Sequence, residues 1–213
     1  MIKLGNVFIL GDSYSSFCGY IPENYDFWYP NKNEEQTDVK KVEQTWWWQL
    51  LETTDSNLVR NSSWSGTTIC NTCRPTLDIQ TSFVSRFEKL VNDGFFEEKN
   101  IDTFFVFGGT NDSCIDSPIG ELMFEDWQQD DLLYVLPAVS YLFSRIKEVL
   151  PRAKIINIIN TDLKEVLSDG MKKATEYFDI EYIQLENISK QHGHPNIKGM
   201  SQICNQILEY LTK

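Results

Sequence analysis

The sequence has 213 residues, a formal net charge of −12, and 41% hydrophobic and 13% aromatic residues. A chain of this length can bury one sizeable core, so we expect a single domain over residues 1–213 rather than a disordered or fibrous protein. The excess of acidic residues argues against a nucleic-acid partner, because phosphate binding needs clustered Lys and Arg, and no apolar run reaches the roughly 20 residues needed to span a membrane.

Five short apolar or β-branched runs predict strands, and the segments between them have helical periodicity. The predicted strands cover residues 7–10, 57–60, 101–107, 154–159 and 180–185. Apolar residues repeat at helical spacing near 83–91, 135–149, 163–178 and 200–211, and Pro195 stands shortly before the last of these segments. Strands that alternate with helices pair in parallel through right-handed crossovers, which predicts a three-layer α/β/α sandwich.

Small and polar residues follow four of these predicted strands or precede the last helix. The four segments are Gly11-Asp12-Ser13-Tyr14-Ser15, residues 60–68, Gly108-Gly109-Thr110-Asn111-Asp112, and Gln191-His192-Gly193-His194-Pro195-Asn196. Each segment alone is compatible with a turn or a helix cap. In an open parallel sheet, however, ligands bind beyond the carboxyl ends of the strands, so the joint occurrence favours a functional site at this edge.

Two further segments, residues 17–44 and 113–130, are long and irregular, and we expect both to project over the same edge. Five cysteines, an odd number, are not the framework of a secreted disulfide scaffold, and reduced thiols are expected. Cys70 and Cys73 have the spacing of half a zinc site, but no second Cys or His pair follows at finger spacing. We therefore predict no metal and no cofactor, and the absence of a signal-peptide pattern predicts a cytoplasmic protein.

Four features of the sequence together resemble the four signature blocks of the SGNH (GDSL-type) hydrolases. They are Gly-Asp-Ser, a glycine after the second strand, Gly-x-Asn-Asp, and His-Pro near the C-terminus. The resemblance runs from residue 11 to residue 199 and implies a flavodoxin-like fold with a five-stranded parallel sheet. It implies that Ser13 is the nucleophile and His194 the general base, and that the backbone N–H groups of Ser13 and Gly66 form an oxyanion hole with the side chain of Asn111. The same blocks contain four candidate substrate contacts, which are Asp12, Tyr14, Trp64 and Asp112.

These residue types fit the chemistry of acyl transfer. A serine hydroxyl needs a neutral imidazole to take its proton, and we expect the dipole of the following helix to help keep His194 neutral. His192 is a competing base, but it lacks the proline that follows the histidine in the family motif.

One position departs from the family pattern. An Asp usually lies three residues before the catalytic His, and this chain has Gln191 there. Three hypotheses follow: Gln191 or a backbone carbonyl orients the ring and leaves a Ser-His dyad, a carboxylate such as Glu186 or Asp162 replaces the missing Asp, or the enzyme is weak or inactive. We favour the dyad.

The predicted function is a serine esterase that cleaves a small acyl group, an O-acetyl or other short-chain ester, with a carbohydrate as one candidate acyl carrier. The alternative is a catalytically silent protein that binds an acylated or glycan ligand. Aromatic residues of the loop 17–44 and Trp64 could stack on a sugar ring, or could fill the core of the loop.

Overall fold

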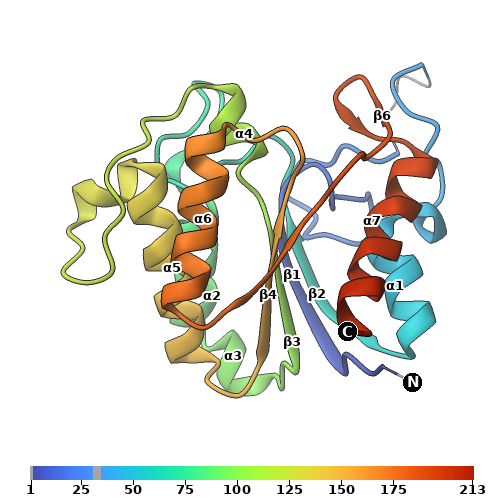
Figure 1. Ribbon diagram of the computed structural model, residues 1–213, viewed down its shortest axis with the longest axis horizontal. Helices are drawn as coiled ribbons and strands as arrows, with labels where there is room; N and C mark the ends of the chain where they lie inside the picture. Colours follow the sequence, from blue (N-terminus) through green and yellow to red (C-terminus); the bar gives the residue numbers. More distant parts are fainter. Residues whose placement is uncertain (1, 31–34) are drawn as a thin grey trace.

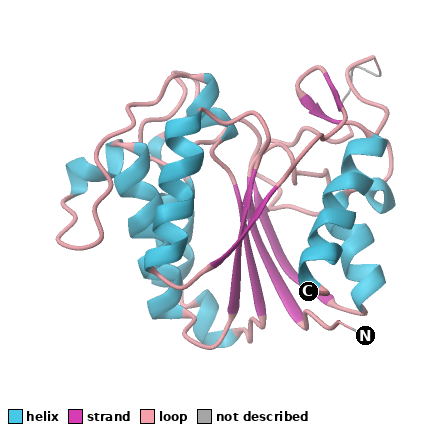
Figure 2. Ribbon diagram, viewed as in Figure 1, coloured by secondary structure: helices cyan, strands magenta, loops and turns pink. Residues whose placement is uncertain are grey.

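The computed structural model describes residues 2–30 and 35–213. A parallel sheet lies between two layers of helices (Figures 1 and 2). Its five strands are β1 (Asn6–Gly11), β2 (Asn57–Ser63), β3 (Thr103–Phe107), β4 (Lys154–Ile159) and β5 (Glu181–Gln184), in the order β2-β1-β3-β4-β5. The predicted three-layer α/β/α sandwich is confirmed, and each predicted strand overlaps an observed one.

The helices divide between the two faces of the sheet (Figure 1). On one face lie α1 (Trp46–Thr54) and α7 (Ile197–Leu211); on the other lie α2 (Phe83–Asn92), α3 (Phe95–Glu98), α5 (Val135–Val149) and α6 (Glu165–Tyr177). Short elements are α4 (Thr110–Cys114), the 3-10 helices Val42–Gln44, Ile79–Thr81 and Gln129–Leu133, and a hairpin of β6 (Lys190–Gln191) and β7 (His194–Pro195). None of the described helices is long and apolar enough to cross a membrane.

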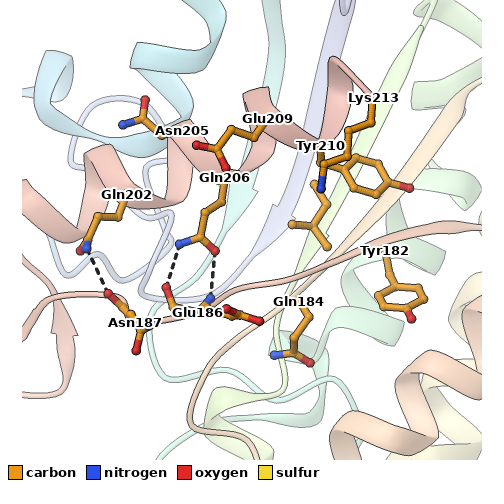
Figure 3. A pocket seen from close by; sticks show the side chains of 11 residues that line it. Tyr182, Gln184, Glu186, Asn187, Gln202, Asn205, Gln206, Glu209, Tyr210 and Lys213 are labelled. Carbon is orange, nitrogen blue, oxygen red and sulfur yellow. Dashed lines mark hydrogen bonds between the residues drawn. The ribbon is translucent and has the colours of Figure 1, made fainter.

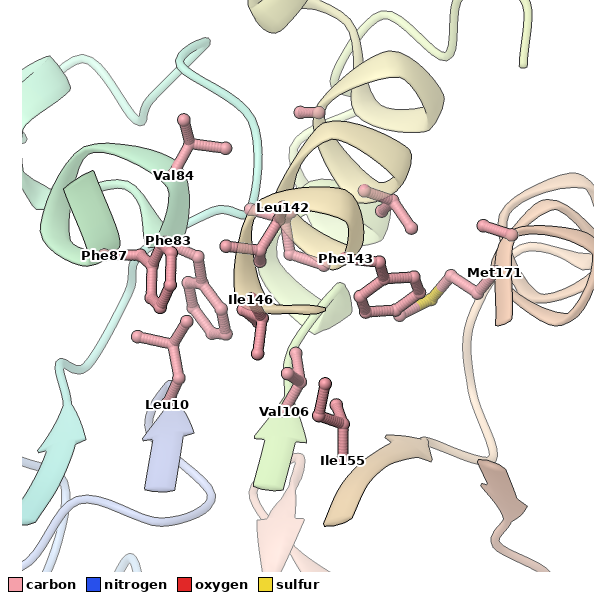
Figure 4. Close-up of a cluster of buried hydrophobic side chains, with 14 of the residues drawn as sticks. Leu10, Phe83, Val84, Phe87, Val106, Leu142, Phe143, Ile146, Ile155 and Met171 are labelled. Carbon is pink, nitrogen blue, oxygen red and sulfur yellow. The ribbon is translucent and has the colours of Figure 1, made fainter. Parts of the chain in front are cut away.

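Alternate residues of the central strands supply the two halves of the core. In β3, Phe104 and Val106 pack with the α2, α5 and α6 side chains, of which Figure 4 shows a part, while Phe105 and Phe107 pack with those of α1 and α7. All four side chains are at most 1% exposed. A strand that is buried on both faces has a continuous apolar sequence, which is why this segment was recognisable before the fold was known.

The tryptophans of α1 connect that helix to the segment after β1. The indole N–H of Trp46 donates to Ser15 Oγ at 3.1 Å, and that of Trp47 donates to the Ser15 carbonyl oxygen at 3.0 Å. Both rings are buried, while Trp48 is half-buried. Three consecutive rings cannot share one helical face, and the third accordingly turns away from the core.

The strand order changes direction at β1, which pairs with β2 on one side and β3 on the other. Segments that leave β1 and β3 therefore diverge to opposite faces of the sheet, and it is at such a switch point, beyond the carboxyl ends of the strands, that open α/β sheets bind ligands. Gly11 ends β1 at this edge, where a Cβ would lie 2.5 Å from Ser63 Oγ. The glycine is thus required by the close approach of β2.

The two long segments behave differently. Residues 17–30 return to the carboxyl edge, where the Cys18 N–H donates to the Tyr29 carbonyl oxygen at 2.7 Å. The predicted loop 17–44 also includes residues 31–34, which lie outside the described residues. The segment 113–130 instead packs on the outer helices: Phe124 stacks on Tyr177 of α6, and Trp127 donates to Ser140 of α5. The expectation that this second segment projects over the edge of the sheet was wrong, because its aromatic side chains pack against Tyr177 of α6 and Tyr141 of α5.

Candidate active site

Ser13 lies in a tight turn directly after β1. The Asp12 carbonyl oxygen accepts from the Ser15 N–H at 3.2 Å, and Asp12 Oδ1 accepts from the Tyr14 N–H at 3.0 Å. These two bonds fix the backbone on both sides of Ser13, which is 4% exposed. The hydrogen bonds that form the turn therefore also position Ser13.

His194 comes from the β6–β7 hairpin, which reaches the same edge from the other end of the chain. His192 and Gly193 form the two-residue turn with φ of 47° and 77°. Positive φ at both positions matches the right-handed twist of a tight hairpin. The hairpin is fixed over the edge of the sheet by Tyr14 Oη and Tyr29 Oη, which donate to the carbonyl oxygens of Gly193 and Pro195, each at 2.7 Å.

The hairpin brings His194 Nε2 to 2.9 Å from Ser13 Oγ. On the far side of the ring, Nδ1 lies 3.1 Å from the carbonyl oxygen of His192. Since a carbonyl only accepts, Nδ1 must carry the proton, and Nε2 is left as the acceptor that faces the hydroxyl of Ser13. The local backbone thus selects the tautomer that a general base requires.

The pKa of His194 is lowered to about 4, mainly by burial. The hydrogen bond to His192 acts in the opposite direction, and the charge of Lys190 makes a smaller contribution in the same direction as burial. The sequence argument attributed a neutral ring to the dipole of the following helix. The structure supplies a different cause: α7 begins at Ile197 behind the cap Asn196, and desolvation is the largest influence on the ring.

None of the predicted substitutes for the missing carboxylate bonds to His194 in the described part of the chain. Gln191 Nε2 donates to the Glu35 carbonyl oxygen at 2.7 Å. Asp162 pairs with Lys190, whose side chain is 13% exposed and whose Nζ lies 5.3 Å from the centroid of the Tyr14 ring. Of the three hypotheses, orientation of the ring by a backbone carbonyl agrees with the contact between His194 Nδ1 and the His192 carbonyl oxygen.

Glu186 lines a polar pocket of about 610 Å³ between β5 and α7 (Figure 3). Its backbone N–H and carbonyl oxygen both bond to the amide of Gln206, and Gln202 Nε2 donates to the Asn187 carbonyl oxygen in the same way. These glutamines tie the segment after β5 to α7. The pocket contains none of the predicted catalytic residues.

Three candidate oxyanion donors come from the turn after β1 and from the segments that follow β2 and β3. Within the described residues, the backbone N–H groups of Ser13 and Gly66 have no hydrogen-bond acceptor, and Gly66 has φ of 84°. Asn111 Nδ2 donates one hydrogen to the Thr67 carbonyl oxygen at 2.9 Å, which leaves its second N–H available. The Arg74 guanidinium donates to Asn111 Oδ1 at 3.0 Å and so fixes the orientation of the amide.

Asp12 and Asp112, predicted as candidate substrate contacts, are at most 1% exposed. Asp112 accepts from the N–H groups of Ile69 and Cys70 at 2.9 to 3.3 Å and so holds the loop that carries Arg74. Burial raises the pKa of Asp12 to about 7 and that of Asp112 above its usual range. Both carboxyl groups face inward and stabilise backbone turns.

A fully buried arginine lies beneath the candidate oxyanion donors. Arg86 of α2 donates to the carbonyl oxygens of Gly11, Ser62 and Thr81 and to Thr67 Oγ1. It therefore joins the ends of β1 and β2 to the loop that follows Gly66. Burial lowers its pKa to about 10, so the guanidinium stays charged at neutral pH.

Two tryptophans complete the surroundings of the site. Trp28 stacks on His194 with ring centroids 3.6 Å apart and planes inclined by 10°. Trp64, a predicted substrate contact, stacks on Tyr25 with centroids 4.1 Å apart. Both belong to the aromatic residues that the sequence identified, but their partners lie too far along the chain to be read from local patterns.

Cys70 and Cys73 are free thiols near these loops, and burial raises the pKa of each. Among residues 2–30 and 35–213, no group of three or more His, Cys, Asp or Glu side chains is arranged to hold a metal ion. Arg74 and Lys190 were not identified from the sequence. Neither stands in a motif, and each acquires its position only through a loop or hairpin held by distant residues.

Comparison with known proteins places this geometry in a family. The model of the GDSL-like lipase/acylhydrolase family matches residues 5–211. A structure described as "a putative GDSL-like lipase" from Bacteroides ovatus is 37% identical, with a TM-score of 0.90 and 99% of both chains covered. Another of the same description, from Bacteroides uniformis, is 38% identical with a TM-score of 0.89, over 98% of this chain and 95% of that one.

More distant structures share the fold alone. One is an acetyl xylan esterase from the rumen bacterium Butyrivibrio proteoclasticus, 18% identical with a TM-score of 0.64, covering 99% of this chain and 64% of that one. No curated protein matches. The family match spans nearly the whole chain, and the two structures from Bacteroides exceed a third in identity; the chain belongs to the GDSL-like lipase/acylhydrolase (SGNH hydrolase) family.

Proposed function

We propose that this chain is a serine esterase that cleaves a small acyl ester, with Ser13 as nucleophile and His194 as general base. The observation that carries the proposal is the 2.9 Å approach of His194 Nε2 to Ser13 Oγ, with the proton of the ring held on Nδ1. A neutral imidazole at this distance is the arrangement that makes a serine hydroxyl nucleophilic.

In the first half of the reaction, Ser13 Oγ forms a bond to the acyl carbon while its proton passes to His194 Nε2. The electron pair of the carbonyl moves to oxygen and produces an oxyanion. The backbone N–H groups of Ser13 and Gly66 and the second N–H of Asn111 are the proposed donors to it, each contributing roughly 3 kcal/mol by analogy with a single oxyanion donor.

The tetrahedral intermediate then collapses. The bond to the leaving alcohol breaks, and the alcohol oxygen takes the proton from His194 Nε2. In the second half, water attacks the carbonyl carbon of acyl-Ser13 and gives a proton to the same nitrogen. The bond between this carbon and Ser13 Oγ then breaks, Oγ takes the proton back from His194 Nε2, and the carboxylic acid and free Ser13 are released. A pKa of about 4 keeps His194 unprotonated, and thus able to act as a base, over the neutral and mildly acidic range.

The surroundings of Ser13 support a small acyl group. Only 4% of Ser13 is exposed, so little space around the residue is open to an incoming ester, which favours a small acyl group. The Tyr25–Trp64 stack on the Gly66 side offers aromatic surface suited to a sugar ring. Carbohydrate esterases appear among the distant relatives in fold, including one from Clostridium thermocellum in complex with cellohexaose, so we propose acetylated carbohydrates as the first substrates to test.

The direct test is covalent labelling with a fluorophosphonate serine probe, together with hydrolysis of p-nitrophenyl acetate. We expect the wild-type protein to be labelled and active, and Ser13→Ala to lose both properties by at least a thousand-fold in rate. His194→Gln should lose both while remaining folded. Ser168→Ala, on the outer helix α6, is the matched control and should behave as the wild type.

The competing hypothesis is a silent protein that binds an acylated or glycan ligand. The observation that favours it is that no carboxylate of residues 2–30 and 35–213 bonds to His194. A folded wild-type protein that neither reacts with the probe nor hydrolyses short-chain esters would refute the esterase proposal. A panel of acetylated glycans and p-nitrophenyl esters of increasing chain length then separates the candidate substrates.

A further inference from the structure

His194 must become a cation during the proposed reaction, yet it has no anionic partner in the described part of the chain. Its Nδ1 donates to the carbonyl oxygen of His192, a dipole without net charge. Lys190, in the same hairpin, adds positive charge nearby, although its own partner Asp162 offsets part of this charge. A carboxylate in the usual triad would stabilise the imidazolium, and here that contribution must come from another group.

The indole of Trp28 is positioned to supply it. The two rings are nearly parallel, with centroids 3.6 Å apart and an interplanar angle of 10°. The face of an aromatic ring carries negative electrostatic potential and attracts a cation placed above it, most strongly when the pair is shielded from water. The attraction is much larger for imidazolium than for neutral imidazole. The stack therefore stabilises the transition state more than the ground state, which is the requirement for catalysis.

The backbone around Trp28 is held by the two segments that carry the reacting groups. The Trp28 N–H donates to Ser16 Oγ at 2.9 Å, and the N–H of the neighbouring Tyr29 donates to the Ser16 carbonyl oxygen at 3.3 Å. Tyr29 Oη donates to the Pro195 carbonyl oxygen at 2.7 Å. Trp28 is thus fixed to the turn after Ser13 and to the residue after His194, which keeps its ring over the imidazole.

We propose that Trp28 is the positioning residue of His194 and that its π face takes the electrostatic part of the missing carboxylate. This inference rests on the proposed esterase function of Ser13 and His194. In the reaction, the proton of Ser13 moves to His194 Nε2 as before, and Trp28 stabilises the resulting positive charge without exchanging a proton.

Fluorinated tryptophans introduced at position 28 alone test the proposal, because each fluorine withdraws electron density from the ring with little change in shape. We expect kcat for p-nitrophenyl acetate to fall stepwise with the number of fluorines, by roughly two- to thirty-fold over the series, with KM nearly constant. The same series at Trp127, which packs on Tyr141 beside α5, is the matched control and should leave kcat unchanged.

A second readout follows the charge on the ring directly. In a His192→Gln background His194 is the only histidine, so its NMR titration can be assigned without ambiguity. Fluorination of Trp28 should lower the pKa of His194 stepwise, while Ser13, Tyr14, Lys190 and Asp162, the other polar and charged groups around the ring, stay unchanged. If neither kcat nor the pKa of His194 changes with fluorination, the proposed role of Trp28 is overturned. An inactive wild-type protein would instead refute the esterase function.

Discussion

Arg74 is the charged side chain that bonds directly to a candidate oxyanion donor. Its guanidinium donates to Asn111 Oδ1 at 3.0 Å while Asn111 Nδ2 is held by the Thr67 carbonyl oxygen. A cationic donor on the amide oxygen polarises the amide and strengthens donation from its nitrogen. A Cβ at Gly66 would lie 3.9 Å from Arg74 Cδ, so the same side chain also passes the second donor loop.

We expect Arg74→Met to lower kcat about five-fold or more, with a smaller effect on KM, because a bond of about 1 kcal/mol that orients and polarises the amide is lost. Steady-state hydrolysis of a short-chain ester measures both constants. Arg152→Met, at an exposed position, is the control. In an Asn111→Ala background the Arg74 substitution should have little further effect; additive losses would contradict a role that acts through Asn111.

At the scale of elements, β1 and β2 end side by side, and Arg86 of α2 holds their last carbonyl groups together. The guanidinium contacts Gly11, Ser62, Thr67 and Thr81 from a fully buried position. The Gly11 oxygen also accepts from the Trp64 N–H at 3.1 Å, but loss of the guanidinium would remove four buried hydrogen bonds at once, and a buried acceptor left without a donor costs about 1 to 3 kcal/mol. One side chain thus stabilises both the sheet and the loop that carries Gly66.

Arg86→Met should therefore lower the free energy of unfolding by about 3 kcal/mol or more, as measured by urea denaturation. Lys89→Met on the same helix is the matched control. Its Nζ forms an exposed pair with Asp93, with side-chain exposures of 66% and 54%, and exposed pairs contribute at most about 1 kcal/mol. Equal losses in the two variants would show that the buried hydrogen bonds of Arg86 are not what stabilises this edge.

The elements also differ in how far the sequence reveals them. The strand of residues 154–159 was predicted with the observed bounds, and the apolar run 101–107 contains β3, because burial on both faces leaves an unmistakable apolar pattern. The β6–β7 hairpin was not predicted, since strands of two residues have no periodicity to detect. Yet this hairpin carries His194 and, through its turn, the His192 carbonyl oxygen that lies 3.1 Å from His194 Nδ1.

Across the whole molecule, the candidate site joins residues 181 positions apart, Ser13 and His194, and its remaining groups come from the loops after β2 and β3. The motif residues could be located from sequence because their types and order are diagnostic of the family. Arg74 and Lys190 could not, and Trp28 was recognisable only as one of the aromatic residues of the loop 17–44, because the roles of all three depend on contacts with segments that are distant along the chain. Their positions are a product of the fold rather than of any local pattern.

The burial of His194 also connects the site to the stability of the molecule. The folded chain keeps the ring neutral down to a pKa of about 4, whereas the ordinary value of 6.5 applies when it is unfolded. Between these two values the unfolded state binds more protons. The contribution of His194 to the free energy of unfolding is therefore fully present above pH 6.5 and is lost as the pH falls toward 4.

We expect the difference in unfolding free energy between the wild type and His194→Gln to grow as the pH rises from 4 to 6.5, by up to about 3 kcal/mol, and to stay constant above that range. Asp12, whose pKa is raised to about 7, has the opposite trend between 3.8 and 7, but it is present in both proteins and cancels in the difference. Urea denaturation at several pH values provides the measurement. A difference that is independent of pH would mean that His194 is protonated as readily in the folded chain as in the unfolded one, and that its neutrality as a base has another origin than burial.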